Sequence, residues 1–129
     1  MNLMKGKKGL IMGVANERSI AWGISQKLAE AGADLAFTYL GDALKKRVIP
    51  LAKSLNSDFT LSCNVENKDE IIKLFEDIKT KWGKIDFVVH AVAFSDKSEL
   101  RDLASGITLF FKASPRYVKA NSAPAPANF

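Results

Sequence analysis

The segment 13–23 is the strongest candidate for chemistry in this sequence, and that chemistry is anion binding. It reads Gly-Val-Ala-Asn-Glu-Arg-Ser-Ile-Ala-Trp-Gly and directly follows an apolar run. Gly13 lets the backbone turn sharply and approach a ligand closely. A helix that opens at Ser19 would offer a phosphate free N–H groups and the positive end of its dipole. The segment has neither G-x-G-x-x-G nor a P-loop pattern, so its spacing alone also fits a plain strand-to-helix connection.

The other reactive side chains form no recognisable catalytic or metal-binding set. His90 is the only histidine and ends an apolar run, so we expect a structural hydrogen-bonding group rather than a general base. Cys63 is the only cysteine, which excludes a disulfide framework and a Cys-based metal site. We interpret it as a small core residue rather than a nucleophile.

The elements that must position the turn follow from the apolar pattern, which predicts strands alternating with helices. The predicted strands are 8–14, 34–39, 58–63 and 85–91, and the predicted helices are 19–31, 43–55 and 67–82. Such alternation implies a parallel sheet with right-handed crossovers. The predicted fold is α/β, a Rossmann-like doubly wound parallel sheet truncated after about four strands.

Each predicted helix has an apolar face and at least one terminal signal. The first is expected to be capped by Ser19 and to stop at Gly32, and the third to open with a capping box formed by Asn67 and Glu70. Pro50 predicts a kink or a break in the second helix. The faces expected to be buried are Ile20, Ile24, Leu28 and Ala31; Leu44, Val48, Leu51 and Leu55; and Ile71, Ile72, Phe75, Ile78 and Trp82.

Length and composition are those of one globular domain. The chain has 129 residues, of which 47% are hydrophobic and 26% charged. No apolar run approaches the roughly 18–20 residues of a membrane span, and no secretory signal is recognised, so we expect a cytoplasmic protein without a membrane partner. Residues 1–104 are expected to form the N-terminal half of a dinucleotide-binding domain, and 105–129 an atypical, partly disordered tail.

The net charge of +5 does not by itself indicate nucleic-acid binding. Residues 105–129 contain three basic residues, Lys112, Arg116 and Lys119, and no acidic one. The first 104 residues therefore carry only +2 of the total. A nearly balanced body demands no basic binding face, so we expect no nucleic-acid partner.

Several motifs together resemble the NADH-type enoyl-acyl-carrier-protein reductases, a divergent branch of the short-chain dehydrogenase/reductases. Gly13-x5-Ser-Ile-Ala with the following Trp-Gly is similar to the cofactor turn of that family. Residues 39–47 and 50–52 resemble its second strand and helix, 63–65 its Cys-Asp-Val element and 90–94 the end of its fourth strand. The resemblance covers residues 5–101 or so, and the combination is specific although each piece alone is not.

The resemblance implies binding of NADH and reduction of the double bond of a trans-2-enoyl thioester carried by acyl-carrier protein. It assigns the cofactor to Gly13, Ala15, Ser19, Ile20, Leu40, Asn64, Val65, Ala91, Val92 and Ala93. Leu40 stands where the family often has Gln, and Asn64 replaces the usual Asp, with an amide that can still pair with an adenine amine. Ser95 would border the acyl site, and the full-length family implies a homo-oligomer.

NADPH stays open as the cofactor. The acidic residue that holds an NAD ribose usually ends the second strand, and here Asp42 comes slightly late. Lys45 and Lys46 could meet a 2′-phosphate or could form a solvated helix face. The resemblance favours NADH.

The family uses a tyrosine to polarise the thioester carbonyl, and a lysine seven positions later to hold the cofactor ribose. No such pair is recognised in this sequence. Tyr117 has Pro124 at that spacing. Tyr39 does have Lys46, but a strand end and the far side of a turn do not match a pair on one long helix. We therefore assign no catalytic residue and expect this chain alone to be inactive. A non-catalytic nucleotide-binding module and an interaction protein that works through its basic tail are the alternatives.

Overall fold

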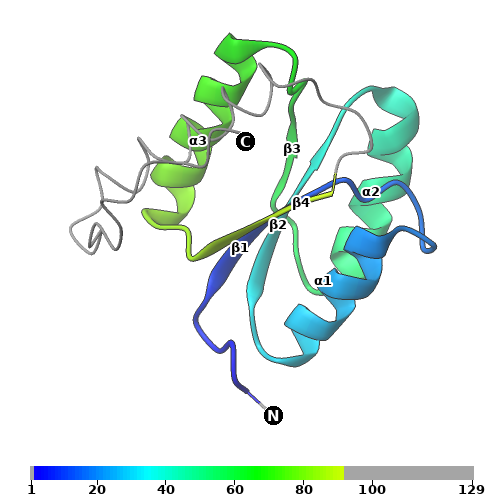
Figure 1. Ribbon diagram of the computed structural model, residues 1–129, viewed down its shortest axis with the longest axis vertical. Coiled ribbons are helices and arrows are strands. Elements are labelled where there is room, and N and C mark those ends of the chain that lie inside the picture. The colour runs from blue at the N-terminus through cyan, green and yellow to red at the C-terminus, as the bar shows by residue number, and fades with distance from the viewer. Residues whose placement is uncertain (1, 92–129) are drawn as a thin grey trace, which may run out of the picture.

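The computed structural model describes residues 2–91, which form strands and helices in the predicted alternating order (Figure 1). The elements are β1 (Lys8–Met12), α1 (Ile20–Glu30), β2 (Asp34–Tyr39), α2 (Asp42–Ser54), β3 (Thr60–Ser62), α3 (Lys68–Trp82) and β4 (Phe87–His90). Most predicted boundaries agree to within two residues, the usual uncertainty of element ends. The third strand is shorter than the predicted 58–63.

The strands form one parallel sheet in the order β3-β2-β1-β4. Ile11 in the middle of the sheet is flanked by Phe37 of β2 and Val89 of β4. The chain adds strands outward from β1 to β3 and then returns to the other side of β1. The reversal creates a switch point between β1 and β4, where open α/β sheets bind ligands. The predicted Rossmann-like fold is confirmed.

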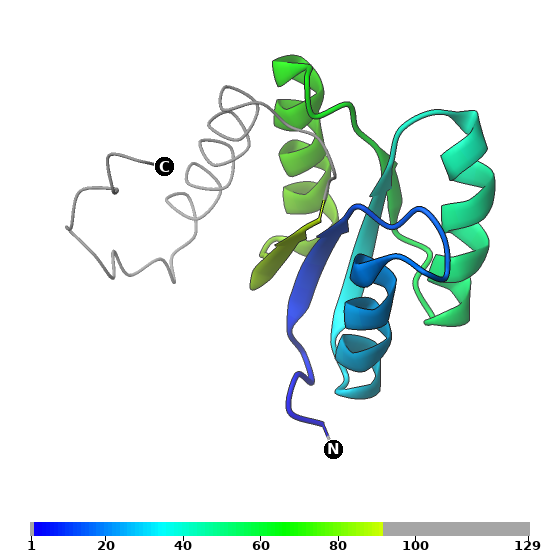
Figure 2. The same ribbon diagram turned by 45° about the vertical axis from the view of Figure 1, so that its right-hand side comes forward.

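The helices cover both faces of the sheet, with α3 on one face and α1 and α2 on the other (Figures 1 and 2). Side chains alternate along β1, so Leu10 and Met12 pack toward α3 while Ile11 packs toward α1 and α2. The helices contribute Ile71, Leu74, Phe75 and Ile78 to the core on the first side and Trp22 and Val48 on the second. The turn after β1 is therefore fixed by a strand that is buried from both sides.

The predicted buried face of α1 is wrong at Ile20 and Ile24, whereas Leu28 packs against the core as expected. Ile20 is 80% exposed and Ile24 38% exposed, whereas Ala21, Trp22 and Ser25 are buried. The small side chains of Ala21 and Ser25 let the helix approach the sheet closely. The Ser25 hydroxyl donates to the Ala21 carbonyl (O···O 2.6 Å), which satisfies its hydrogen-bonding capacity within the helix.

The second helix continues through Pro50 without the predicted break. Proline lacks the N–H that would bond to the Lys46 carbonyl. Both residues lie on the exposed side of α2, where water can solvate that carbonyl. The buried side keeps Val48 and Ala52 against β2, which holds the helix together across the proline.

The predicted capping box of α3 forms only in part. Asn67 Oδ1 accepts from the N–H groups of Asp69 and Glu70 (3.0 and 3.3 Å), as a helix cap should. Glu70 does not reach back to Asn67 but accepts from the Asn64 N–H (N···O 3.2 Å). The start of α3 is thereby tied to the turn after β3.

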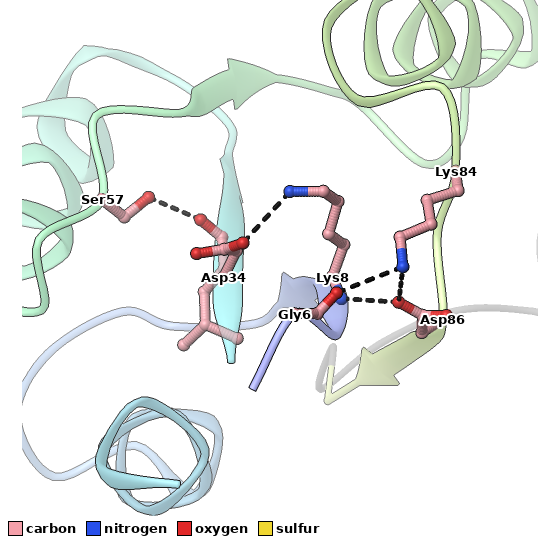
Figure 3. A network of polar contacts seen from close by, with 7 residues as sticks. Gly6, Lys8, Asp34, Ser57, Lys84 and Asp86 are labelled. Carbon is pink, nitrogen blue, oxygen red and sulfur yellow. Dashed lines mark hydrogen bonds and ion pairs between the residues drawn. The ribbon is translucent and has the colours of Figure 1, made fainter. Parts of the chain in front are cut away.

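The amino edge of the sheet is closed by a polar network (Figure 3). Lys8 Nζ pairs with Asp34 (3.1 Å), and the Lys8 N–H donates to Asp86 Oδ2 (2.8 Å). Lys84 Nζ lies 3.3 Å from Asp86 and also donates to the Gly6 carbonyl. Burial raises the pKa of Asp86, but the Lys8 N–H and Lys84 outweigh it, so the pKa lies below its usual value. The network joins β1, β2 and β4 at the edge opposite the predicted binding turn.

Candidate functional site

A groove of about 250 Å³ lies at the carboxyl edge of the sheet, where the parallel strands end together. Its lining is Met12, Gly13, Val14, Ala15, Thr38, Tyr39, Leu40, Leu44, Cys63, Val65 and Ala91. The ends of β1 and β2, the turn after β3 and the residue after β4 all contribute. The walls are mostly apolar, which suits a flat ring or a sugar face better than a strongly charged group.

Five of the residues predicted for the cofactor line this groove: Gly13, Ala15, Leu40, Val65 and Ala91. Three more predicted residues do not line the groove. Ser19 and Ile20 stand at the start of α1, and Asn64 stands in the sequence between the lining residues Cys63 and Val65. Val92, Ala93 and Ser95 lie outside the described residues. The sequence did not point to Thr38, Leu44 or Cys63 as lining residues. Thr38 and Cys63 lie at or just beyond a strand end, and Leu44 lies in the first turn of α2.

Gly13 is required by the way two strand ends meet. Its φ is +109°, and a Cβ there would lie 2.2 Å from the Ala91 carbonyl oxygen. Ala91 in turn donates its N–H to the Met12 carbonyl (N···O 2.9 Å). The sharp turn predicted for Gly13 is present. Within residues 2–91, Gly13 approaches the backbone of Ala91. The glycine therefore lets the ends of β1 and β4 lie side by side at the groove.

Ser19 is the N-cap residue of α1, as predicted, but its side chain closes the turn before the helix. No hydrogen bond joins its side chain to the first turn of the helix. Its Oγ accepts from the N–H groups of Ala15 (2.9 Å) and Asn16 (3.1 Å). The Arg18 N–H is also taken, by Asn16 Oδ1 (2.8 Å). The N–H groups of Ala15, Asn16 and Arg18 in the loop are therefore not free to bind an anion.

The groups that remain free to bind an anion are few and lie together at the start of α1. Within residues 2–91 no acceptor takes the N–H of Ile20 or Ala21, which are the first two of α1. The Ser19 hydroxyl accepts two N–H groups, so its own proton is left to donate. Two helix N–H groups and one hydroxyl at the positive end of a helix dipole can hold a phosphate oxygen.

The turn after β3 places Asn64 at the same edge. Asn64 Oδ1 accepts from the Glu66 N–H (N···O 3.0 Å), and the Asn64 N–H donates to Glu70. The neighbouring Cys63 thiol is buried, and burial together with the Glu70 carboxylate raises its pKa to about 11. Cys63 is therefore neutral near pH 7, in agreement with a core role.

A second groove, of about 480 Å³, lies between the β1–α1 turn and α2. It is lined by Asn16, Glu17, Arg18, Lys46, Arg47, Pro50 and Leu51. Lys46, considered above for a 2′-phosphate, thus faces this groove together with two arginines and one acid. Lys45 is not part of its lining.

No group of metal-binding side chains is found in the part of the chain that the structure describes. None of the helices among these residues is long and apolar enough to cross a membrane.

The sequence profile of the family described as enoyl-(acyl carrier protein) reductase matches residues 13–109, beginning at the glycine of the β1–α1 turn. The chain belongs to the enoyl-(acyl carrier protein) reductase family. The match continues past residue 101, at which the resemblance noted above was taken to end.

Known members of the family agree with this assignment. The chain is 59% identical over 106 residues to enoyl-[acyl-carrier-protein] reductase [NADH] 2 of Rhizobium meliloti. That alignment covers 82% of this chain and 40% of the relative. The chain therefore spans less than half the length of this curated reductase.

Solved structures of family members have the same arrangement of elements. FabI from Candidatus Liberibacter asiaticus superposes with a TM-score of 0.79 at 41% identity, over 86% of this chain and 52% of that one. The reductase from Anaplasma phagocytophilum, solved in complex with NAD, superposes with a TM-score of 0.69 at 52% identity. The latter alignment covers 76% of this chain and 38% of that one.

Proposed function

We propose that this chain binds the dinucleotide NADH at the carboxyl edge of its sheet, as the nucleotide-binding part of an enoyl-acyl-carrier-protein reductase. The observation that carries the proposal is the joint position of the β1–α1 turn and the apolar groove beside it. The pyrophosphate would meet the N–H groups of Ile20 and Ala21 and the Ser19 hydroxyl. The groove would take the adenosine, with Leu40 and Val65 against its rings and Gly13, Ala15 and Ala91 along the sugar and phosphate path.

NADH is favoured over NADPH by the family. The relative from Rhizobium meliloti is an NADH enzyme by name, and the Anaplasma phagocytophilum enzyme was solved with NAD. The groove with Arg18, Lys46 and Arg47 keeps a 2′-phosphate contact open. The ratio of the dissociation constants for NADH and NADPH, measured on the same preparation, decides between them.

The reaction proposed for the whole enzyme is reduction of a trans-2-enoyl thioester of acyl-carrier protein, with the hydride supplied by the cofactor. We further propose that residues 1–104 act as the binding half and 105–129 as an atypical tail. Ser95 would border the acyl group, and Val92 and Ala93 would pass the nicotinamide ribose. A cytoplasmic location and a homo-oligomer of the full-length protein stay predictions.

We also propose that the 129-residue polypeptide by itself does not reduce enoyl thioesters. Its two tyrosines, Tyr39 and Tyr117, have no lysine at the required place on a common helix. The structure places Tyr39 at the end of β2 and Lys46 within α2, which separates them by a turn. The same fact supports a non-catalytic nucleotide-binding module as the second candidate function. An assay with crotonyl thioester and NADH should show no oxidation above buffer, and measurable turnover would contradict this proposal.

Cofactor binding is tested by titrating the 129-residue protein with NADH and following tryptophan fluorescence. We expect saturable quenching, and we expect Ser19→Ala to weaken binding about tenfold, because the variant loses both the turn's hydrogen bonds and the donated proton. Ser54→Ala is the matched control, since the Ser54 hydroxyl bonds only to the Leu51 carbonyl of its own helix. Absence of saturable quenching, or equal weakening by both variants, would remove the basis of the proposal.

A further inference from the structure

One side chain in the carboxyl-edge groove carries a hydrogen-bonding group that the fold does not use. Thr38 is the next-to-last residue of β2, lines the groove and is only 6% exposed. Its hydroxyl makes no hydrogen bond to any group among residues 2–91. A hydroxyl that is largely removed from water and has no partner costs free energy. The position of this hydroxyl therefore calls for a partner from outside these residues.

The Thr38 hydroxyl oxygen opens into the groove. Every fully buried side-chain oxygen or nitrogen in the described part of the chain has a hydrogen-bond partner. Since the Thr38 oxygen has none, it belongs to the small exposed part of the residue. Phe37 packs toward α1 and α2, so Thr38 points to the opposite side of the sheet, the side of the lining residues Cys63 and Val65. A molecule bound in the groove would meet this hydroxyl.

The groove offers few other polar side-chain groups to a ligand. Apart from Thr38, its lining side chains are apolar except for the Cys63 thiol and the Tyr39 phenol, and Tyr39 packs on the α1 and α2 side. Asp42, the first acidic residue after β2, begins α2 and does not line the groove. The end of β2 therefore lacks the carboxylate that usually holds the adenosine ribose in dinucleotide-binding sheets.

We propose that the Thr38 hydroxyl holds one of the two hydroxyls of the adenosine ribose, in place of that carboxylate. The inference rests on the proposed function, since it needs a dinucleotide in the groove. A threonine hydroxyl both donates and accepts, so it pairs with a ribose hydroxyl in either direction. It carries no charge, which suits the apolar walls formed by Met12, Leu40 and Val65 better than a carboxylate would.

The substitution Thr38→Val removes the hydroxyl and keeps the shape of the side chain. We expect it to weaken NADH binding about fivefold, the effect of one lost hydrogen bond. Thr38→Ser keeps the hydroxyl and should bind NADH within about twofold of the parent chain. Because the hydroxyl has no partner in the described fold, Thr38→Val should melt at or above the melting temperature of the parent. A hydroxyl with a purely structural role would give the opposite pattern, a lower melting temperature with unchanged affinity.

The matched control is Thr80→Val, the same chemical change at another place in the chain. The Thr80 hydroxyl donates to the Glu76 carbonyl within α3 (O···O 2.9 Å), and Thr80 does not line the groove. We expect this variant to bind NADH as the parent chain does.

Two analogues of NADH identify the group that Thr38 meets. One lacks the 2′-hydroxyl of the adenosine ribose, and the other lacks the 3′-hydroxyl. The dissociation constants of NADH and of both analogues are measured by tryptophan fluorescence for the parent chain and for Thr38→Val. We expect the difference between the two proteins to vanish for at least one analogue, because that analogue has already lost the hydroxyl to which Thr38 bonds.

The outcomes separate this inference from the proposed function. If the parent chain binds NADH and Thr38→Val binds it equally well, the role of Thr38 is overturned and the proposed function stands. The same conclusion follows if the difference persists with both analogues, or if Thr80→Val weakens binding as much as Thr38→Val does. If the parent chain binds neither NADH nor the analogues, the proposed function fails, and the inference fails with it.

Discussion

At the scale of single residues, Gly13 occupies a position that no other amino acid fits. A side chain there would combine an unfavourable φ of +109° with a contact of 2.2 Å to the Ala91 carbonyl oxygen. We expect Gly13→Ala to lower the free energy of unfolding by about 2 kcal/mol or more. Urea unfolding followed by circular dichroism measures this change.

Gly23 provides the control for that substitution. It lies inside α1, and a Cβ there would meet nothing within 4 Å. Gly23→Ala should therefore stabilise the protein by roughly 0.5–1 kcal/mol, through higher helix propensity. Destabilisation of the same size by both variants would mean that the close approach to Ala91 is not what requires glycine at position 13.

Cys63 shows how burial controls reactivity at the same edge. Burial of the thiol, and then the Glu70 carboxylate, raise its pKa from 9.0 to about 11, so the reactive thiolate is almost absent near pH 7. We expect very slow labelling by a disulfide reagent in native buffer and immediate labelling in urea. Rapid labelling of the folded protein would show that the thiol is accessible and ionised.

The same pKa shift predicts how stability responds to alkaline pH. A thiol whose pKa is higher in the folded protein than in the unfolded chain favours the folded state below pH 9. This contribution is lost as pH rises from about 9 to about 11. Cys63→Ser should show a smaller loss of stability across that range in pH-dependent thermal melts.

At the scale of elements, α3 illustrates which face of a helix is truly buried. Ile72 was predicted to face the core but is 45% exposed, whereas Leu74 is 2% exposed. Leu74→Ala should cost about 2–5 kcal/mol of unfolding free energy, and Ile72→Ala less than about 1 kcal/mol. Chemical denaturation of the two variants in parallel measures both values. Equal costs would mean that the helix is rotated relative to the face described here.

The alternation of strands and helices, and with it a parallel sheet of Rossmann-like class, could be predicted from the sequence, because apolar periodicity and glycine boundaries are local signals. The face of α1 could not. Ile20 and Ile24 look like core residues by spacing, but the sheet accepts the helix through Ala21 and Ser25, whose small size allows close packing. That preference depends on the tertiary contact, which periodicity does not contain.

The candidate site was predictable in its location but not in its hydrogen bonds. Glycine and serine at the ends of the turn indicated anion binding, and the carboxyl edge follows from a parallel sheet. The sequence did not show that the Ser19 hydroxyl is an acceptor for two loop N–H groups, or that Glu70 bonds to Asn64 instead of Asn67. These choices depend on distances of a few tenths of an ångström in the folded chain.

At the scale of the whole molecule, the two edges of the sheet differ in role: one stabilises the fold, and the other holds the candidate binding groove. The amino edge is joined by the ion pairs of Lys8, Asp34, Lys84 and Asp86, while the carboxyl edge keeps an open apolar groove. Such a division is common in parallel sheets, since ligands bind outside the carboxyl ends of the strands. Changes at the amino edge should therefore alter stability and leave dinucleotide affinity unchanged.

Asp86 allows this division to be tested through pH. Its pKa is lower in the folded protein than usual, so its contribution to stability is present above its unfolded pKa of about 3.9 and is lost as pH falls through the folded pKa. Asp86→Asn should be less stable than the parent chain at pH 7, and the difference should shrink below pH 4 or so.

Asp58→Asn is the control for the acid titration. The Asp58 side chain is 92% exposed, and its Oδ1 lies 3.9 Å from Lys81 Nζ, which is a long distance for an ion pair. Its removal should therefore change stability by less than about 0.5 kcal/mol. A gap between Asp86→Asn and the parent that stays constant from pH 7 to pH 3 would contradict the role given to Asp86.

The hydrogen bonds that Ser19 makes across the β1–α1 turn have a thermodynamic consequence. The loop is already locked in a single shape when the protein folds, so an arriving ligand does not have to freeze a mobile segment. The ligand then binds a preformed loop, because the loop has already lost its conformational entropy during folding. Loss of the serine would transfer that cost to the encounter itself, and would be visible as a less favourable binding entropy.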